Sequence, residues 1–298
     1  MKILVSGSTG LIGSALVSFL RSQGYEVARL MRERSVRDEQ TVYWDIPSGT
    51  VETGKLEGLD AVVHLTGVNL GAGRWTVKKK TAFHESRVKA TRVLSDAIAG
   101  LERPPGVFVS ASAVGYYGNR GNEVLYEDSP SGTGFLADLC RQWEDATKPA
   151  AAKGIRVVTT RMGVVLSPRG GALAKLLPIF RLGIGGTVGS GDQYMSWIGI
   201  DDLVLAFHLC LINENVDGPV NMVAPNPVTN AEFTRTLARV CRRPAVFPVP
   251  VWLLKILFGE MAEETLLSSA RVLPGKLHDS GFTFRFPELH EALEYVLK

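Results

Sequence analysis

The feature that most constrains the fold is a glycine-rich turn near the start of the chain, Gly7-Ser8-Thr9-Gly10-Leu11-Ile12-Gly13. It follows a short apolar segment that is typical of a buried strand, and it precedes a segment with helical periodicity. Gly7 allows a tight turn, Gly10 lets the backbone approach a pyrophosphate, and Gly13 lets the helix pack closely on the strand. This order of elements is typical of a dinucleotide-binding turn, and an ordinary strand-to-helix turn is the alternative.

The helix that follows the turn adds an electrostatic reason to expect a phosphate there. The first N–H groups of a helix have no partner within the helix, and the helix N-terminus carries a partial positive charge. The sequence therefore predicts that the turn and the first helical residues bind the cofactor, namely Gly7, Thr9, Gly10, Leu11, Ile12 and Gly13.

The end of the second predicted strand distinguishes two cofactors. An NAD site needs an acidic residue about 20 residues after the turn, where it binds the ribose 2′-OH. Here the strand is followed by Met31, Arg32, Glu33 and Arg34, so a basic residue occupies the strand end. A guanidinium suits a 2′-phosphate, and we predict that Arg32 selects NADP(H). Glu33 as a ribose ligand and Arg32 as a merely solvated side chain are the alternatives.

Short apolar strands alternate with helical segments through the first half of the chain. Such alternation is typical of a parallel sheet covered by helices on both faces, so we predict an α/β, Rossmann-like, doubly wound fold. Glycine and proline become dense between residues 168 and 191, which favours a separate smaller lobe. We predict an NADP-binding domain over residues 1–165, to which 195–225 return, and a C-terminal substrate lobe of residues 166–194 and 226–298. The predicted strands are 2–6, 26–30, 60–65, 107–110, 155–160 and 219–223, and the predicted helices are 11–23, 86–99, 137–152 and 200–211.

Composition and charge exclude several other classes of protein. The chain has 298 residues, of which 45% are hydrophobic and 21% charged, and this balance excludes wholesale disorder. Its 33 basic residues are scattered along the sequence, so we expect no nucleic-acid partner. Three cysteines without a CxxC pair indicate a reducing compartment, and neither they nor the histidines form a metal-binding pattern. Without a signal peptide or a membrane-spanning apolar run, we expect a cytoplasmic monomer or homodimer with no membrane partner.

Longer motifs in the chain resemble the short-chain dehydrogenase/reductase superfamily in its extended form. Residues 60–67 look like the DxVxHLAG motif of that superfamily, and residues 109–118 look like the Ser-Ser-x-x-Val-Tyr-Gly segment of sugar-nucleotide epimerases. Residues 197–203 resemble the later aspartate-containing segment of the superfamily. Residues 161–171, 185–197 and 221–233 resemble segments of its atypical epimerase-family branch. The resemblance implies a Rossmann-like domain that binds NADP(H), together with a smaller C-terminal lobe for a small-molecule substrate.

Four further residues are predicted to bind the cofactor. The match to the DxVxHLAG motif implies that Leu65, Thr66 and Gly67 lie beside it. Arg87, which lies in the following helical segment, is placed to pair with a cofactor phosphate. A surface salt bridge is the alternative for Arg87.

One departure from the superfamily bears directly on the chemistry. Its reductases and epimerases use a Tyr-x-x-x-Lys pair, in which the lysine lowers the pKa of the tyrosine so that it can exchange a proton with the substrate. None of the seven tyrosines of this chain is followed by lysine at that spacing, and the matching helix carries Leu136 and Cys140 at the two positions. The usual acid/base pair is therefore absent.

Other residues near the predicted sheet edge are candidates for the chemistry. Ser112 matches the substrate-orienting serine of the superfamily, and Tyr116 follows it where the strand ends. We predict that these two residues are catalytic, with packing as the alternative for the tyrosine. The predicted substrate-binding residues are Asn69, Arg74, Tyr117, Gln193 and Trp197.

These features lead to two hypotheses about function. The first is an NADP(H)-binding oxidoreductase or epimerase-like enzyme that acts on a small polar substrate such as a nucleotide sugar. The second is a protein that binds NADPH as a sensor or regulator without turnover. The motifs of the C-terminal lobe favour the enzyme, and the missing tyrosine–lysine pair favours the binding protein.

Overall fold

The computed structural model describes residues 1–32 and 40–298, and its centre is an eight-stranded sheet. The strand order is β12-β8-β6-β5-β1-β2-β3-β4, and every neighbouring pair is parallel except β3 and β4. This order confirms the predicted Rossmann-like α/β fold. The strands are β1 (Lys2–Ser6), β2 (Glu26–Met31), β3 (Thr41–Asp45), β4 (Thr50–Val51), β5 (Ala61–His64), β6 (Val107–Ala113), β8 (Arg156–Met162) and β12 (Gly218–Met222).

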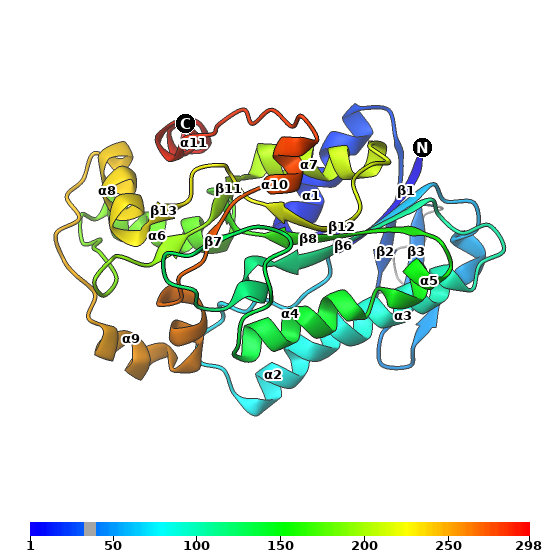
Figure 1. The fold of residues 1–298 in the computed structure, drawn as a ribbon, viewed down its shortest axis with the longest axis horizontal. Helices are drawn as coiled ribbons and strands as arrows, with labels where there is room; N and C mark the ends of the chain where they lie inside the picture. Colours follow the sequence, from blue (N-terminus) through cyan, green and yellow to red (C-terminus); the bar gives the residue numbers. More distant parts are fainter. Residues whose placement is uncertain (33–39) are drawn as a thin grey trace.

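Helices cover both faces of the sheet, as Figure 1 shows. One face is covered by α1 (Leu11–Ser22), α7 (Ile200–Ile212) and α10 (Gly275–Asp279), and the other by α3 (Ala90–Ala99), α4 (Phe135–Asp145) and α5 (Lys148–Ala152). The three central residues of β1 are all apolar because their side chains face the cores on both sides of the sheet. Ile3 and Val5 pack in the core with α1 and α7, whereas Leu4 points to the opposite core with α3.

A smaller lobe lies beyond the carboxyl ends of the strands. It contains a third core, to which α6, α8 and α11 contribute Leu177, Leu237 and Leu293. Its elements are β9 (Val164–Leu166), α6 (Gly171–Arg181), β10 (Tyr194–Met195), β11 (Trp197–Gly199), β13 (Val228–Thr229), α8 (Asn230–Cys241), α9 (Val251–Phe258), η4 (Ala262–Leu266) and α11 (Leu289–Val296). The short elements of the larger domain are η1 (Thr53–Lys55), α2 (Val77–His84), η2 (Glu85–Lys89), η3 (Val114–Tyr117), and β7 (Val124–Leu125), which pairs with β14 (Arg271–Val272).

Three differences from the sequence prediction affect longer elements. Residues 41–45 form a strand, β3, that the pattern did not indicate and that lies between β2 and β4, and the glycine-rich stretch 168–191 contains α6 in spite of Pro178. The helix predicted over 137–152 is two helices, α4 and α5, separated at Ala146 and Thr147. Within the part of the chain that the structure describes, no helix is long and apolar enough to span a bilayer.

Candidate functional site

The turn between β1 and α1 is built by three glycines, each for a steric reason. Gly7 has a φ of +64°, and a Cβ built on it would lie 2.8 Å from the carbonyl oxygen of Leu65 at the end of β5. A Cβ on Gly13 would lie 2.2 Å from the Gly7 carbonyl oxygen. Gly10 N–H donates to that same oxygen over 3.0 Å and closes the turn. Any side chain at Gly7 or Gly13 would therefore force the backbone apart.

Within the described part of the chain, the N-terminus of α1 has neither a capping side chain nor an acidic residue in its first turn. Gly10 is the N-cap of this helix. Thr9 and Gly10 are exposed, and the first-turn N–H groups of Leu11, Ile12 and Gly13 have no acceptor within the helix. This arrangement presents backbone donors and a partial positive charge to an anion.

The ends of β1 and β5 are joined directly beneath this turn. Ser6 Oγ lies 2.6 Å from His64 Nδ1 and accepts hydrogen bonds from Leu65 N–H and the Thr66 hydroxyl, both over 3.0 Å. His64 is fully buried, and burial lowers its pKa to about 3, so the ring is neutral. We therefore assign His64 to the support of the turn.

Arg87 is a buried cation, not a surface residue. Only 8% of it is exposed, and its Nη2 donates to the Val68 carbonyl oxygen over 3.0 Å. The guanidinium lies over the Trp143 ring at 5.2 Å, and a Cβ on Gly67 would lie 3.2 Å from its Cζ. Burial lowers the pKa of Arg87 to about 10. Among the described residues no carboxylate forms an ion pair with it, so the surface salt bridge considered from the sequence is absent.

Ser112 is part of a closed network between β6 and β8. It is fully buried, and its hydroxyl donates to Glu144 Oε1 over 2.7 Å. Arg161, the register partner of Ser112 on β8, binds both oxygens of Glu144 at 2.9 Å. Burial lowers the pKa of Arg161, but the bonds to Glu144 outweigh this effect and the net shift is upward. Ser112 has no exposed surface, and its hydroxyl hydrogen is already donated to Glu144. This placement therefore does not support direct contact between Ser112 and a substrate.

The two adjacent tyrosines have different environments. Tyr117 is fully buried, its hydroxyl lies 2.7 Å from Asn221 Oδ1 and accepts from Arg161 Nη1, and burial raises its pKa to about 12. Tyr117 therefore has no surface available to a substrate. Tyr116 is partly exposed, and its ring lies under the Arg161 guanidinium with 3.4 Å from Cζ to the ring centroid. Of the predicted catalytic pair, only Tyr116 has free surface.

The positions of the missing tyrosine–lysine pair are filled by apolar packing. A Cβ on Gly115 would lie 3.3 Å from Leu136 Cβ and 3.9 Å from Cys140 Sγ, so both side chains face the turn that carries Tyr116. Burial raises the pKa of the Cys140 thiol to about 12, which leaves it an unreactive thiol at neutral pH.

The residues predicted to bind substrate lie in two groups. The first follows β5: Asn69 Oδ1 accepts from Gly71 N–H over 2.9 Å, and Arg74 Nη1 donates to the Ile256 carbonyl oxygen of α9 over 2.9 Å. Both side chains are exposed. This loop is therefore fastened to α9.

The second group lies in the smaller lobe and is engaged in its structure. Gln193 Nε2 donates to the Val188 and Leu266 carbonyl oxygens, both over 3.1 Å. Trp197 is fully buried, and its Nε1 donates to the Asn226 carbonyl oxygen over 2.9 Å. Contact of Trp197 with substrate is not supported by this placement, because it has no exposed surface.

The sequence motifs did not predict two residues of the site, Glu144 and Arg161. For Arg32, the structure describes only part of the surroundings. Glu144 and Arg161 organise the β6–β8 edge, and the available signal was an arginine near the end of a strand whose other charged residue, Arg156, is at its start. Arg32 is exposed directly after β2, while Glu33 and Arg34 lie outside the described residues. No group of three or more metal-ligating side chains occurs within residues 1–32 and 40–298.

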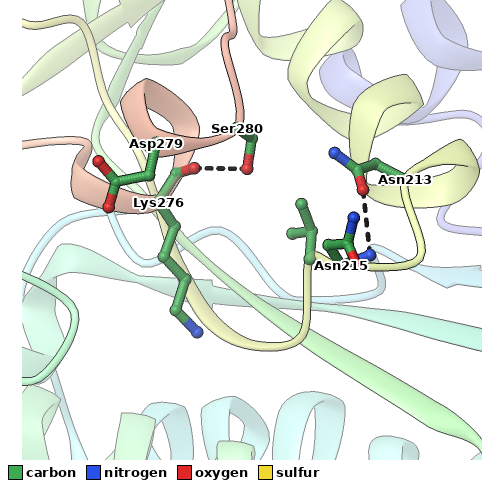
Figure 2. A pocket seen from close by; sticks show the side chains of 6 residues that line it. Asn213, Asn215, Lys276, Asp279 and Ser280 are labelled. Carbon is green, nitrogen blue, oxygen red and sulfur yellow. Dashed lines mark hydrogen bonds between the residues drawn. The ribbon is translucent and has the colours of Figure 1, made fainter.

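Two cavities lie at the amino ends of β8 and β12, away from the glycine turn. One of about 540 Å³ is bounded by residues at the starts of these two strands, including Arg156 and Gly218. The other, of about 400 Å³, is shown in Figure 2 and is lined by Asn213, Asn215, Val216, Lys276, Asp279 and Ser280. In that cavity Ser280 Oγ donates to the Lys276 carbonyl oxygen, and Asn215 N–H donates to Asn213 Oδ1. Ligands of open α/β sheets bind at the opposite, carboxyl edge, so we do not place the cofactor in either cavity.

Comparison with known proteins gives consistent matches over the whole chain. Residues 3–224 match the NAD-dependent epimerase/dehydratase family, and residues 249–296 match a domain of unknown function, DUF1731. An epimerase family protein of Mycobacterium bovis is 44% identical over 294 residues, which are 99% of this chain and 97% of the relative.

Two solved structures are similar in both sequence and fold. The crystal structure of human epimerase family protein SDR39U1 with NADPH has a TM-score of 0.91 and 34% identity, and the match covers 99% of each chain. A nucleoside-diphosphate sugar epimerase from Corynebacterium glutamicum has a TM-score of 0.82 and 36% identity. That match covers 100% of this chain and 58% of the other, longer chain.

Proposed function

The chain belongs to the NAD-dependent epimerase/dehydratase family, and on that premise we propose that it is an NADP(H)-dependent oxidoreductase or epimerase-like enzyme. Its substrate class is a small polar carbonyl or alcohol, and a nucleotide sugar is the first candidate. Two features together carry the proposal: an open glycine turn, and the buried cation Arg87, which forms no ion pair with a carboxylate of the described residues. A phosphate-bearing ligand satisfies both features at once.

The residues at the carboxyl edge fit such a cofactor. The space that a Cβ would fill at Gly10 lies beside the α1 N-terminus, where the first-turn N–H groups of Leu11 and Ile12 would hold the pyrophosphate. Arg87, beneath Gly67, would pair with phosphate from the side of β5. Arg32, exposed after β2, would bind the 2′-phosphate that distinguishes NADPH from NADH. The bound cofactor supplies hydride transfer, and binding and orientation remain the work of the protein.

Tyr116 is the residue that we assign to proton transfer. It follows β6 at the carboxyl edge, and it is the partly exposed member of the tyrosine pair. Glu144 and Arg161 hold its ring in place through the stacked guanidinium, so we assign them a positioning role. A phenol without a lysine beside it donates a proton at neutral pH but is a poor base. The expected direction is therefore reduction of a carbonyl group by NADPH.

A second function is favoured by one specific observation. Leu136, Cys140 and Ser112 are all withdrawn from chemistry, the first two by packing and the third by its bond to Glu144. A protein that binds NADPH as a sensor or regulator, without turnover, needs none of these groups. Both functions share the cofactor site and differ only in whether Tyr116 reaches a reacting carbonyl.

A screen of carbonyl compounds and nucleotide sugars with purified protein and NADPH separates the two functions. For an enzyme, Tyr116→Phe lowers kcat by about 10²–10⁴-fold, which is the usual contribution of general acid catalysis, and leaves NADPH affinity unchanged. Tyr126→Phe is the matched control, because Tyr126 is exposed and lies outside the proposed site, directly after β7. Equal rates in wild type and Tyr116→Phe would refute the assignment. Tight NADPH binding without turnover on any compound would favour the sensor.

A further inference from the structure

One surface of the smaller lobe carries exposed apolar side chains on adjoining elements. Residues 182–189 run beside residues 244–251, joined by hydrogen bonds from Phe247 N–H to Gly185 and from Val249 N–H to Thr187, over 3.3 and 2.8 Å. Helix α9 continues directly from the second segment, at one end of the molecule (Figure 1). Seven apolar side chains on these elements are more than half exposed, and we call them the apolar patch: Leu182, Ile184, Val246, Phe247, Trp252, Ile256 and Leu257.

Helix α9 cannot bury its own apolar surface against the protein. Seven of its eight residues are apolar and Lys255 is the exception, yet only Leu254 is fully buried. Trp252 and Ile256, one turn apart on the same face, are 63% and 60% exposed. Isolated exposed apolar residues are normal, but a contiguous group on a helix that is apolar all round indicates a surface that binds something else.

The two segments that carry the apolar patch are basic. Residues 162–191 and 233–259 contain eight of the 33 basic residues of the chain and none of its 30 acidic residues. Arg181, Arg242 and Arg243 are exposed, and within the described part of the chain none of them is in an ion pair. The acidic residues that follow α9, Glu260 and Glu263, are paired with Lys80 and Lys255. The patch is therefore bordered by arginines without counter-ions.

We propose that the apolar patch docks on the surface of an anionic lipid bilayer. The arginines would contact the headgroup phosphates, while Phe247 and Trp252 enter the boundary between headgroups and acyl chains. An anionic bilayer is a more favourable partner than a second copy of the chain, because two copies would bring the same unpaired arginines close together. A bilayer surface also needs no spanning segment. The sequence-based expectation of no membrane partner rested on the absence of such a segment and does not bear on surface docking.

Flotation of the full-length protein with lipid vesicles tests the proposal. We expect binding to phosphatidylcholine vesicles that contain one third phosphatidylglycerol, release as salt is raised, and no binding to phosphatidylcholine alone. The triple variant Arg181→Gln, Arg242→Gln, Arg243→Gln should bind about a hundredfold more weakly, since each cation near an anionic surface contributes about fivefold. The control triple variant Lys2→Gln, Lys148→Gln, Lys153→Gln removes the same charge from residues outside the patch and should bind like wild type.

The apolar contribution has its own readout. Trp252 is the only exposed tryptophan among the five, so brominated lipid should quench part of the fluorescence of wild type. Trp252→Phe should bind with much less quenching, and Trp252→Ser should bind more weakly. Absence of wild-type binding, or equal weakening by the two triple variants, would overturn the proposal. A dimer in sedimentation that Trp252→Ser dissociates would assign the patch to a second copy instead. Thermal melts confirm that each variant folds, and NADPH titration keeps this result separate from the proposed cofactor site.

Discussion

Two regions along the carboxyl edge of the sheet differ in whether their polar groups are hydrogen-bonded within the chain. At β1 and α1, glycines leave the backbone bare, and the N–H groups of the first helical turn have no acceptor in the helix. At β6 and β8, Ser112, Glu144 and Arg161 satisfy one another in a buried network. The first region is organised for a ligand that is not part of the chain, and the second region is complete in itself. The two regions thus differ in whether their polar groups are satisfied within the chain.

The largest effect that we expect comes from disrupting the buried network of Ser112, Glu144 and Arg161. Glu144→Ala leaves Arg161 buried without its carboxylate, and removal of one partner of a buried ion pair costs about 3–5 kcal/mol of unfolding free energy. Urea unfolding measures this loss. Asp145→Ala is the matched control, because Asp145 is an exposed residue one position further along α4 and should change stability little. Equal stability of the two variants would contradict the network.

The second largest effect should come from a side chain placed at Gly10, in the glycine turn. A Cβ at Gly10 would lie 3.3 Å from the Gly7 carbonyl oxygen, and the branches of Val would occupy the space beside the helix N-terminus. We expect Gly10→Val to weaken NADPH binding roughly a hundredfold while the protein still folds. Gly54→Val serves as the control, since a Cβ there meets nothing within 4 Å. Normal NADPH affinity in Gly10→Val, measured by calorimetry, would make the turn purely structural.

The contribution of His64, which lies beneath the glycine turn, to the unfolding free energy should depend on pH. His64 has a pKa of about 3 in the folded protein against about 6.5 in the unfolded chain, so the unfolded state binds the extra proton between these values. The unfolding free energy should therefore fall as pH falls through this window, by about 2 kcal/mol between about pH 6.5 and about pH 4.5. His64→Asn keeps a polar group near Ser6 but does not titrate, and its stability should lose this component. Parallel pH slopes for both proteins would exclude a buried neutral histidine.

The smallest effect should come from the exposed end of β2. Arg32→Ala should reduce the preference for NADPH over NADH by about tenfold, because one charged hydrogen bond to the 2′-phosphate is lost at a solvent-exposed position. Titration of both cofactors into wild type and variant measures the ratio. NADH affinity should stay constant, and a parallel loss for both cofactors would mean that Arg32 does not distinguish them.

Features that depend on neighbouring residues were predictable from the sequence, and those that depend on distant residues were not. The glycine turn and the apolar strand β1 are local, and both appear as expected. The bond from Ser112 to Glu144 joins residues 32 positions apart, and the burial of Trp197 depends on the lobe around it. A motif can therefore identify a serine or a tryptophan without revealing whether its polar atom is already engaged.

The proximity of Arg87 and Cys140 also restricts how this site can evolve. The two side chains are close enough that the cation favours the thiolate, and both are buried. A lysine at position 140 would therefore add a second buried cation beside Arg87, with no described carboxylate paired to either. Repulsion between two desolvated like charges makes this pair unstable. Lysine at position 140 and arginine at position 87 should therefore exclude one another among proteins of this fold.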